Sequence, residues 1–514
     1  MPFNSIFSWI IKKRLHQIDL FRKHPAEVQN DVLMHLVTAA QNTEWGKKYG
    51  YKDISSISDY QKNVPLQDYE QLQPYVDRLI KNEQNLLWNT DIKMFAKSSG
   101  TTSGKSKFIP VSNEAVAECH YKGGKDLLSL YYHNFPDRKL YNGKHLIVGG
   151  SAQINMLSAN SYIGDLSSII IKNLPFWAEI RRTPKRKIAL MSDWEDKIDK
   201  MAESTLKEDV YILAGVPSWT LVLMNKVLEL SGKDKITDVW PNLELYMHGG
   251  VNFAPYKAQF DKIIGNPNMN YVETYNASEG FFGIQDQVNS NEMLLMLDYG
   301  IFYEFIPMDK FDHINSKEVV GLKDVEVGKN YALVISTNSG LWRYIIGDTV
   351  MFTSNEPYRF KITGRTKHFI NAFGEELIVE NVEKAIGIAC SRTNSEVQEY
   401  TVAPVYMDAE GKNGKHEWLV EFSKEPENLA QFTEILDNAL KSVNTDYEAK
   451  RTGNLTLDLP DVQKMPVGTF YEWLKSKNKL GGQHKIPRLS NNRELIEEVL
   501  QLSVLKKAKS IINE

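Results

Sequence analysis

Apolar positions recur at helical spacing through about the first ninety residues and then give way to short apolar runs. Leu33, Leu36 and Val37 are spaced as on one face of an α-helix. The runs 94–96 and 146–148 have the length of strands, and polar segments separate them from their neighbours. The pattern predicts a helical start, followed by short strands that alternate with helices.

End signals mark two helices in the middle of the chain. Asp193 is a helix-capping residue type, and an apolar stripe follows it up to Leu206. Ser218 is predicted to cap a second helix, and Gly232 is predicted to end it.

The strand signal becomes stronger toward the centre of the chain. Strands are predicted over 243–247 and 271–275, each followed by glycine or polar residues. From Met293 onward the pattern turns to β, with further strands predicted over 293–297, 301–306 and 331–336.

The main domain boundary is placed at Thr363-Gly364-Arg365, giving domains 1–363 and 364–514. The smaller domain is predicted to hold helices near 380–389 and 429–440 and strands near 401–406 and 417–422. The fold class is therefore α/β. A large N-terminal α/β domain with a β-barrel-like portion precedes a smaller α+β domain.

The bulk composition narrows the class of protein. A hydrophobic content of 42% and a charged content of 25% are typical of a globular protein, and the net charge of −4 argues against nucleic-acid binding. No apolar run is long enough for a membrane span, and Lys12 and Lys13 follow the short N-terminal apolar patch, the reverse of a secretory signal. Cys119 and Cys390 lie in no metal-ligand spacing and are expected to be buried in a reducing cytosol. A cytoplasmic protein is predicted.

The first candidate site is the segment 98–107, which contains only hydroxyl residues, glycines and lysines. Glycines let backbone N–H groups wrap an anion, hydroxyls donate to phosphate oxygens, and lysine adds charge. It is not a Walker loop, because Gly100 and Gly104 enclose three residues where four are needed. A phosphate-binding loop between two strands is predicted, and a solvated surface loop is the alternative. The candidates are Ser98, Ser99, Gly100, Thr101, Thr102, Gly104 and Lys107.

Three further segments offer groups that nucleotide chemistry uses. Tyr275, at a strand end, offers a flat face for a purine, and Glu279 offers a hard oxygen ligand for Mg²⁺. Asp348, predicted to end another strand, suits a ribose diol. Lys485 follows a pair of glycines and is a cation for developing negative charge. The alternatives are an exposed polar turn, an aspartate in a β-turn and an ordinary surface lysine.

In this order, the four segments resemble the auxin-responsive promoter family of acyl acid–amido synthetases, within the superfamily that includes acyl-CoA synthetases, peptide-synthetase adenylation domains and luciferases. Residues 98–107 are similar to its Ser-Ser-Gly-Thr-[Thr/Ser]-x-Gly loop, and 275–279 to its Tyr-x-x-Ser-Glu motif. Residues 344–348 are similar to its Tyr-Arg-x-Gly-Asp motif, and 483–488 to its Gln-x-Lys-x-Pro-Arg motif. The resemblance covers nearly the whole chain.

Two departures from the plant pattern stand out. Ile345 occupies the position where plant members usually carry arginine. The segments 364–367 and 373–376 are more similar to the hinge of the wider superfamily. A bacterial-type relative is expected, and auxin itself is not assigned as the substrate.

The resemblance implies a reaction in two steps. A carboxylic acid attacks the α-phosphate of ATP, giving an acyl adenylate and pyrophosphate, and an amine, expected to be that of an amino acid, then displaces AMP. The smaller domain is expected to rotate about the segment near Lys367 between the steps. An acyl-CoA ligase and a non-catalytic nucleotide-binding relative remain the alternatives.

The resemblance also assigns roles to single residues. The loop hydroxyls would hold phosphate oxygens and Glu279 would hold Mg²⁺, while Lys485 would neutralise charge at the α-phosphate. The remaining nucleotide-binding assignments are Gly249, Gly250, Tyr275, Ser278, Asp348 and Arg365.

The acid pocket is expected near 216–219, with Tyr162, Phe176 and Trp177 as wall candidates. For Phe176 and Trp177 a core position is favoured. His248, beside the glycines, is expected to be structural rather than a base.

Overall fold

The computed structural model describes residues 2–98, 107–138, 140–149, 155–156, 161–191, 193–250, 253–366, 369–370, 375, 377–405, 414–444, 447–448, 451, 457–479, 485–490 and 493–512. The chain forms two compact units. The larger comprises 1–251 and 261–362, and the smaller comprises 252–260 and 363–514. The division after Ile362 lies beside the boundary predicted from the sequence, whereas the grouping of 252–260 with the smaller unit was not predicted.

The larger unit begins with helices, as the spacing predicts. The apolar face of the second helix, with Leu33, Leu36 and Val37, is buried in the core. The fifth helix begins with a capping box in which Asp68 accepts from the N–H of Gln71. These helices are α1 (Pro2–Lys23), α2 (Pro25–Ala40), α3 (Glu44–Lys48), α4 (Ile57–Asn63) and α5 (Tyr69–Ile80).

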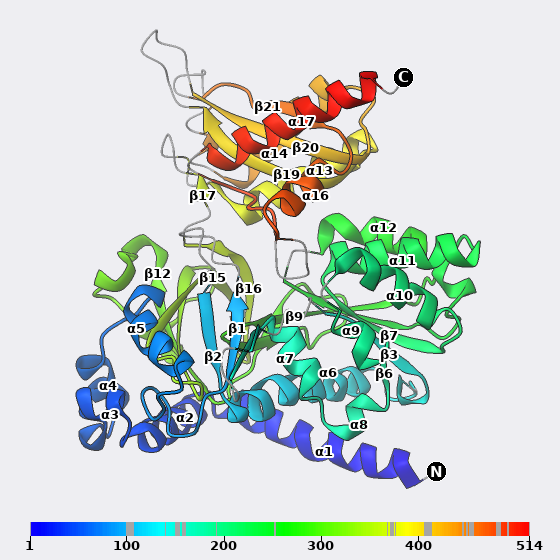
Figure 1. Cartoon of the computed structure of the whole chain (residues 1–514). Coiled ribbons are helices and arrows are strands. Elements are labelled where there is room, and N and C mark those ends of the chain that lie inside the picture. The colour runs from blue at the N-terminus through cyan, green and yellow to red at the C-terminus, as the bar shows by residue number, and fades with distance from the viewer. Residues whose placement is uncertain are drawn as a thin grey trace. The chain divides into compact units, whose positions relative to one another are not determined.

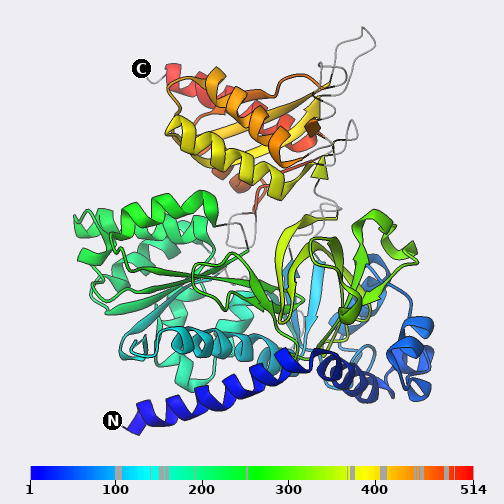
Figure 2. The same cartoon turned by 180° about the vertical axis from the view of Figure 1, so that it is seen from behind.

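In the described residues, one large sheet of twelve strands organises this unit, and five of these strands form a parallel part. Helices α10 (Trp194–Thr205) and α11 (Pro217–Ser231) cover one side of the parallel strands, and α6 (Tyr121–Asn134) covers the other (Figures 1 and 2). The parallel strands are, in spatial order, β6 (Arg182–Thr183), β3 (Lys144–Val148), β7 (Val210–Gly215), β8 (Leu245–Gly249) and β9 (Asn270–Ala277).

Beyond β9 the same sheet becomes antiparallel, and Figures 1 and 2 show this half strongly curved. The strands predicted over 293–297, 301–306 and 331–336 are confirmed here. In spatial order the antiparallel strands are β10 (Gly280–Ile284), β11 (Met293–Leu295), β16 (Tyr358–Arg365), β15 (Tyr344–Asn355), β14 (Asn330–Thr337), β12 (Ile301–Pro307) and β13 (Val320–Gly321).

A second, smaller sheet contains the two strands that flank the predicted phosphate loop. Its order is β2 (Lys107–Val111), β1 (Met94–Ser98), β5 (Tyr162–Gly164) and β4 (Asn155–Met156). Strands β1 and β2 are antiparallel, and Ser98 pairs with Lys107. The prediction that the loop joins two strands, and not a strand and a helix, is confirmed.

The helix end signals are confirmed with one exception. The Asp193 side chain accepts from the N–H of Asp196 at 2.8 Å, and Gly232 ends α11 in the left-handed conformation at φ 64°. The cap predicted at Ser218 is wrong. Helix α11 begins at Pro217, whose fixed φ and missing N–H suit the first helical position, and Val216 precedes it without a side-chain cap.

In the residues that the structure describes, the smaller unit packs helices on a three-stranded sheet, and its predicted helices and strands are confirmed. Its strands are β19 (Glu396–Val405), β20 (Lys415–Lys424) and β21 (Asp461–Met465), with a short pair β17 (Phe369–Ile370) and β18 (Leu377–Ile378). Its helices include α13 (Val379–Thr393), α14 (Leu429–Val443), α16 (Thr469–Ser476) and α17 (Glu494–Ile512).

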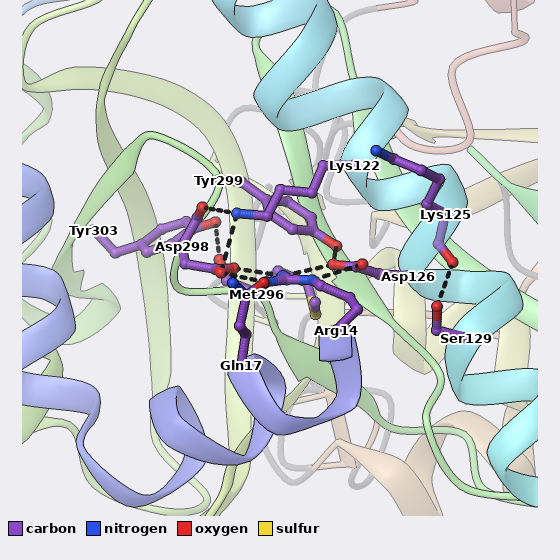
Figure 3. A network of polar contacts seen from close by, with 10 residues as sticks. All are labelled: Arg14, Gln17, Lys122, Lys125, Asp126, Ser129, Met296, Asp298, Tyr299 and Tyr303. Atoms are coloured by element: carbon purple, nitrogen blue, oxygen red, sulfur yellow. Dashed lines mark hydrogen bonds and ion pairs between the residues drawn. The ribbon is translucent and has the colours of Figure 1, made fainter. Parts of the chain in front are cut away.

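A network of buried charges ties α1 to the body of the larger unit (Figure 3). Arg14 donates to the carboxylate of Asp126 at 2.7 and 2.6 Å and to that of Asp298 at 2.7 and 2.9 Å. The hydroxyl of Tyr299 donates to Asp126 at 2.7 Å, and Lys122 pairs with Asp298 at 3.0 Å. The opposite charges balance, so their burial is compensated within the network.

The cysteines and the membrane prediction can be compared directly with the structure. Cys119 is buried as predicted, but Cys390 is only half-buried, so that part of the prediction is wrong. Within the described residues, none of the helices combines the length and the apolar character that crossing a bilayer demands.

Candidate active site

The carboxyl ends of four parallel strands meet at one edge of the large sheet. In the registers of β3, β7, β8 and β9, Val148 pairs with Gly215, Gly215 with His248, and His248 with Glu273. This edge of an open α/β sheet is where ligands bind. The last of these four strands, β9, is also the strand at which the sheet changes from parallel to antiparallel.

Gly249 and Gly250 are required by the backbone at this edge. A Cβ on Gly249 would lie 2.4 Å from the carbonyl oxygen of Thr274, so only glycine permits the close approach of β8 to β9. Gly250 has φ 82°, which favours glycine. Their predicted contact with the base of a nucleotide stays a prediction.

The polar segment that follows Tyr275 is the tip of a β-hairpin. Strand β9 continues two residues beyond the predicted end, to Ala277, which pairs with Gly280 of β10. Ser278 and Glu279 therefore form a two-residue turn, with Ser278 buried and Glu279 partly exposed. A hairpin with a two-residue turn thus carries the predicted metal ligand.

Asp348 was predicted to end a strand, and this is wrong because it lies inside β15. Residues 346–348 stand opposite a single residue of β14, since Ala332 pairs with Thr349 and Val334 with Ile345. Gly347 has φ 93°, which allows this bulge. A bulge redirects the side chains beside it, and the Asp348 side chain is buried here.

The structure joins two of the predicted residues directly. The hydroxyl of Tyr275 donates a hydrogen bond to Oδ2 of Asp348, across strands that are 73 residues apart in sequence. The Tyr275 ring packs on Phe282, with centroids 4.7 Å apart, and on Phe360, with centroids 6.1 Å apart. Because Tyr275 is only 6% exposed, most of its surface lies within the protein. Its role under an adenine base stays a prediction.

The described part of the phosphate-loop candidate consists of its two ends. The Nζ of Lys107 lies 5.6 Å from the ring centroid of Tyr69, whose hydroxyl accepts from the N–H of Phe108 at 2.8 Å. Ser98 is the last residue of β1, and its backbone is described. The other candidates lie outside the described residues: Ser99, Gly100, Thr101, Thr102 and Gly104.

Titratable groups at this edge include a pair that the sequence did not reveal. The Nζ of Lys197 donates to the carbonyl of Gly149, at the end of β3, at 2.8 Å. Burial lowers the pKa of Lys197 to about 8 and raises the pKa of Asp165, just after β5, to about 6. Neither Lys197 nor Asp165 lies in a sequence motif that would have identified it.

His248 fits a structural role better than that of a base. Its side chain is buried, and burial lowers its pKa to about 3. The imidazole is therefore neutral at pH 7 and a weak proton acceptor.

The side chains predicted to line the acid pocket differ in their exposure to solvent. Trp219 is buried, and the Tyr162 hydroxyl accepts from Asn173 at 2.8 Å. Phe176 is 81% exposed, so the expected core position is wrong. The side chain of Trp177 lies outside the described residues.

Arg365 and Lys485 belong to the smaller unit, and both are exposed. The residues that follow Lys485 are held on β19. The N–H of Val402 donates to the carbonyl of Arg488 at 2.9 Å, and Thr401 Oγ1 donates to the carbonyl of Pro487 at 2.7 Å. Lys485 therefore stands at the edge of a fixed segment, and its role stays a prediction.

No group of three His, Cys, Asp or Glu residues arranged for a metal ion is found in the part of the chain that the structure describes. A magnesium ion bound with a nucleotide needs only one or two carboxylates, because phosphates and waters supply the other ligands. Glu279 at the hairpin tip fits that requirement.

Three family models match the chain in sequence order. They are described as the GH3 family N-terminal domain, over residues 14–269, the GH3 family central domain, over 294–365, and the GH3 family C-terminal domain, over 380–494. The central model includes Asp348 and the C-terminal model includes Lys485, whereas β9 and its hairpin with β10 lie between the first and the second model.

Curated relatives span nearly the whole length of the chain. An indole-3-acetic acid-amido synthetase from Arabidopsis thaliana, GH3.3, is 23% identical over 94% of this chain and 93% of its own length. A 4-substituted benzoates-glutamate ligase from the same plant, GH3.12, is 22% identical over 94% and 96%. A jasmonoyl-L-amino acid synthetase from Oryza sativa subsp. japonica, GH3.5, is 22% identical over 93% and 95%.

Solved structures share the fold. The GH3.15 acyl acid amido synthetase superposes with a TM-score of 0.78 over 95% of each chain, at 18% identity. A 2-hydroxyisobutyryl-CoA ligase in complex with 2-HIB-AMP has a TM-score of 0.57 over 93% of this chain and 91% of its own, at 13% identity. The fold is that of the adenylate-forming enzymes, as predicted.

Proposed function

This chain belongs to the GH3 family, and from that premise we propose that it is an ATP-dependent ligase that joins a carboxylic acid to an amine, with an amino acid as the acceptor. The relatives in this family are named amido synthetases and ligases. The single observation that carries the proposal at the level of the site is the hydrogen bond from Tyr275 to Asp348. It joins two segments of the nucleotide signature at the edge of the sheet where ligands bind.

A carboxylate is a poor acyl donor, because its charge is delocalised and oxide is a poor leaving group. In the proposed first step a carboxylate oxygen attacks the α-phosphorus of ATP and pyrophosphate leaves. In the second step the amine attacks the acyl carbon, the bond to AMP breaks, and the amine loses a proton. The loop 98–107 would bind the phosphates with hydroxyl and N–H donors.

Asp348 is suited to the ribose. Carboxylate oxygens accept hydrogen bonds from hydroxyl donors, and the hydroxyl of Tyr275 holds this carboxylate in one orientation. A carboxylate that is already held in one orientation loses less conformational entropy on binding than a mobile one. Arg365 is proposed as a second contact to the ribose.

Glu279 would hold Mg²⁺, which neutralises phosphate charge when it is bound. The Glu279 side chain extends from the two-residue turn 278–279 of a hairpin. Because the neighbouring Ser278 is buried, the backbone that carries the carboxylate is held in place. Lys485 would stabilise the additional negative charge that develops at the α-phosphate.

The test is ATP–pyrophosphate exchange, which requires adenylation and no acceptor. We expect exchange with at least one member of a panel of carboxylic acids, and amide formation when amino acids are added. Asp348→Asn should raise the KM for ATP. Asp312→Asn, at an exposed position just before the helical turn His313–Asn315, should not. The absence of exchange with every acid would contradict the proposal, and a product only with coenzyme A would favour an acyl-CoA ligase.

A further inference from the structure

A π-helix lies directly after the strand that closes the phosphate loop. The segment η2 (Ala115–His120) has π-helical hydrogen bonding and continues into α6. Single-turn π-helical segments are rare and frequently mark functional sites. This one packs against β10, the second strand of the hairpin that carries Glu279.

Two side chains of this π-helix hold both strands of the hairpin. The Sγ of Cys119 accepts from the N–H of Phe281, in β10, at 3.1 Å. The Nδ1 of His120 lies 3.0 Å from Oδ1 of Asn276, in β9, and donates to it in the Nδ1–H tautomer. Asn276 and Phe281 face each other in the strand register, just before and just after the turn 278–279. The turn is thus held from both sides.

The packing behind this contact leaves no room for movement toward α6. A Cβ on Gly123, in the first turn of α6, would lie 2.6 Å from the ring of Phe281. The helix and the hairpin therefore approach as closely as the aromatic ring permits.

The opposite end of the segment is fixed as well. Ser112, one residue after β2, donates through its N–H to Oγ of Ser339 at 3.0 Å and through its hydroxyl to the carbonyl of Asn338 at 2.7 Å. The same hydroxyl accepts from the N–H of Ala115 at 2.9 Å. The chain from β2 to His120 is therefore a short connection with both ends anchored.

Both side chains are uncharged at neutral pH. Burial lowers the pKa of His120 to about 4, and burial raises the pKa of Cys119 to about 12. Their contacts with the hairpin are hydrogen bonds between neutral groups, so they bring no charge that would compete for a metal ion or a phosphate.

We propose that η2 is a positioning element of the nucleotide site, in which His120 and Cys119 set the place of the turn 278–279 relative to β2. This inference rests on the proposed function, since it assigns a role toward Glu279 and the loop that β2 closes. His120 and Cys119 act through the hairpin and are positioning residues. A segment of fixed length then determines the distance between the end of β2 and the turn that carries Glu279.

The test compares His120→Leu with His120→Asn and with His145→Leu. Asn retains an amide group near the position of Nδ1, so it should restore the contact. His145 is the matched control, because burial also lowers its pKa to about 4 and its ring bonds a backbone carbonyl, that of Leu140, at 3.3 Å.

Two measurements are made on the full chain. In ATP–pyrophosphate exchange, His120→Leu should raise the Mg²⁺ concentration for half-maximal rate by about tenfold, the scale typical of residues that orient a metal ligand. His120→Asn and His145→Leu should stay close to the parent protein. In hydrogen exchange, the amides of 276–281 should exchange faster in His120→Leu alone.

Two outcomes would overturn the positioning role, and a third would overturn the proposed function. Unchanged hydrogen exchange at 276–281 in His120→Leu would overturn the positioning role, whatever the activity. Equal shifts in Mg²⁺ dependence for His120→Leu and His145→Leu would also overturn it, because the effect would then be one of general stability. If the parent protein shows no exchange of pyrophosphate with any acid, the proposed function fails, and hydrogen exchange alone decides whether η2 positions the turn.

Discussion

The hydroxyl of Tyr275 donates a hydrogen bond to the carboxylate of Asp348, and this contact joins the parallel half of the large sheet to its antiparallel half. Tyr275 lies on β9, the last parallel strand, and Asp348 lies in the bulge of β15. Tyr275 therefore orients the carboxylate of Asp348, and this role is separate from the predicted packing of its ring on adenine. A nucleotide that binds Asp348 would bind an oxygen acceptor whose orientation Tyr275 has already fixed.

Removal of that hydroxyl should weaken nucleotide binding. We expect Tyr275→Phe to raise the KM for ATP by about tenfold, since a hydrogen bond to a charged group contributes about 1.5–3 kcal/mol, and to change the pyrophosphate exchange rate at saturating ATP much less. Tyr303→Phe is the matched control, because its buried hydroxyl donates to the carbonyl of Met296 at 3.0 Å (Figure 3). An equal KM for ATP in Tyr275→Phe and the parent protein would show that the orientation of Asp348 by Tyr275 does not contribute to ATP binding.

Replacement of the predicted catalytic cation should separate chemistry from binding. Lys485→Ala should reduce the rate of adenylate formation by about a hundredfold, which corresponds to a few kcal/mol of stabilisation at the α-phosphate, and should leave ATP affinity nearly unchanged. Rapid-quench measurement of adenylate and equilibrium binding of ATP give the two quantities. Lys477→Ala, an exposed lysine paired with Glu498 at 2.7 Å, serves as control. A parental adenylation rate in Lys485→Ala would exclude this lysine.

Replacement of Arg14, which lies at the centre of the charge network in Figure 3, should cause a large loss of stability. Arg14→Met leaves the buried Asp126 without a cation, whereas Asp298 keeps Lys122, and an uncompensated buried charge costs about 3–5 kcal/mol. Arg78→Met removes an exposed network with Glu44 and Glu83, and it should lower stability far less because water screens exposed ion pairs. Urea unfolding should show the larger fall in midpoint for Arg14→Met. Equal midpoints for the two variants would show that burial does not decide the effect.

Local patterns in the sequence were sufficient to predict most elements of the fold. Asp193 was found as a cap because a capping residue and an apolar stripe are both visible in the sequence. Ser218 misled because Pro217 begins the helix one residue earlier, and two start signals compete there. Asp348 was misplaced because the bulge at Gly347 interrupts the apolar pattern without ending the strand.

The site was only partly predictable, because its contacts join distant segments. The motifs identified Tyr275 and Asp348 separately, but the bond between them depends on how the two halves of the sheet meet. The contact of His120 with Asn276 spans 156 residues, and no local signal distinguishes this histidine from others. Cys119 was expected to be only a small buried residue, although its sulfur also accepts a backbone N–H.

Three histidines predict how stability depends on pH. Burial lowers the pKa of His120 and of His145 to about 4 and that of His248 to about 3, whereas an unfolded histidine has a pKa of about 6.5. Below pH of about 6.5 the unfolded chain therefore binds more protons than the folded one, and the free energy of unfolding falls as the pH falls. Each histidine should contribute a slope of up to about 1.4 kcal/mol per pH unit, from about pH 6.5 down to its folded pKa. The full contribution is present above this window.

Urea unfolding between pH 7.5 and pH 5 measures this slope. His120→Asn removes one titrating group and keeps an amide at the hairpin contact, so its stability should fall less steeply with acid than that of the parent protein. His24→Asn is the control, because His24 is largely exposed and lies beside Glu27 at the start of α2. Its curve should parallel that of the parent protein. Parallel curves for His120→Asn and the parent protein would mean that His120 is not held neutral by burial, and the account of its bond to Asn276 as one between neutral groups would then be wrong.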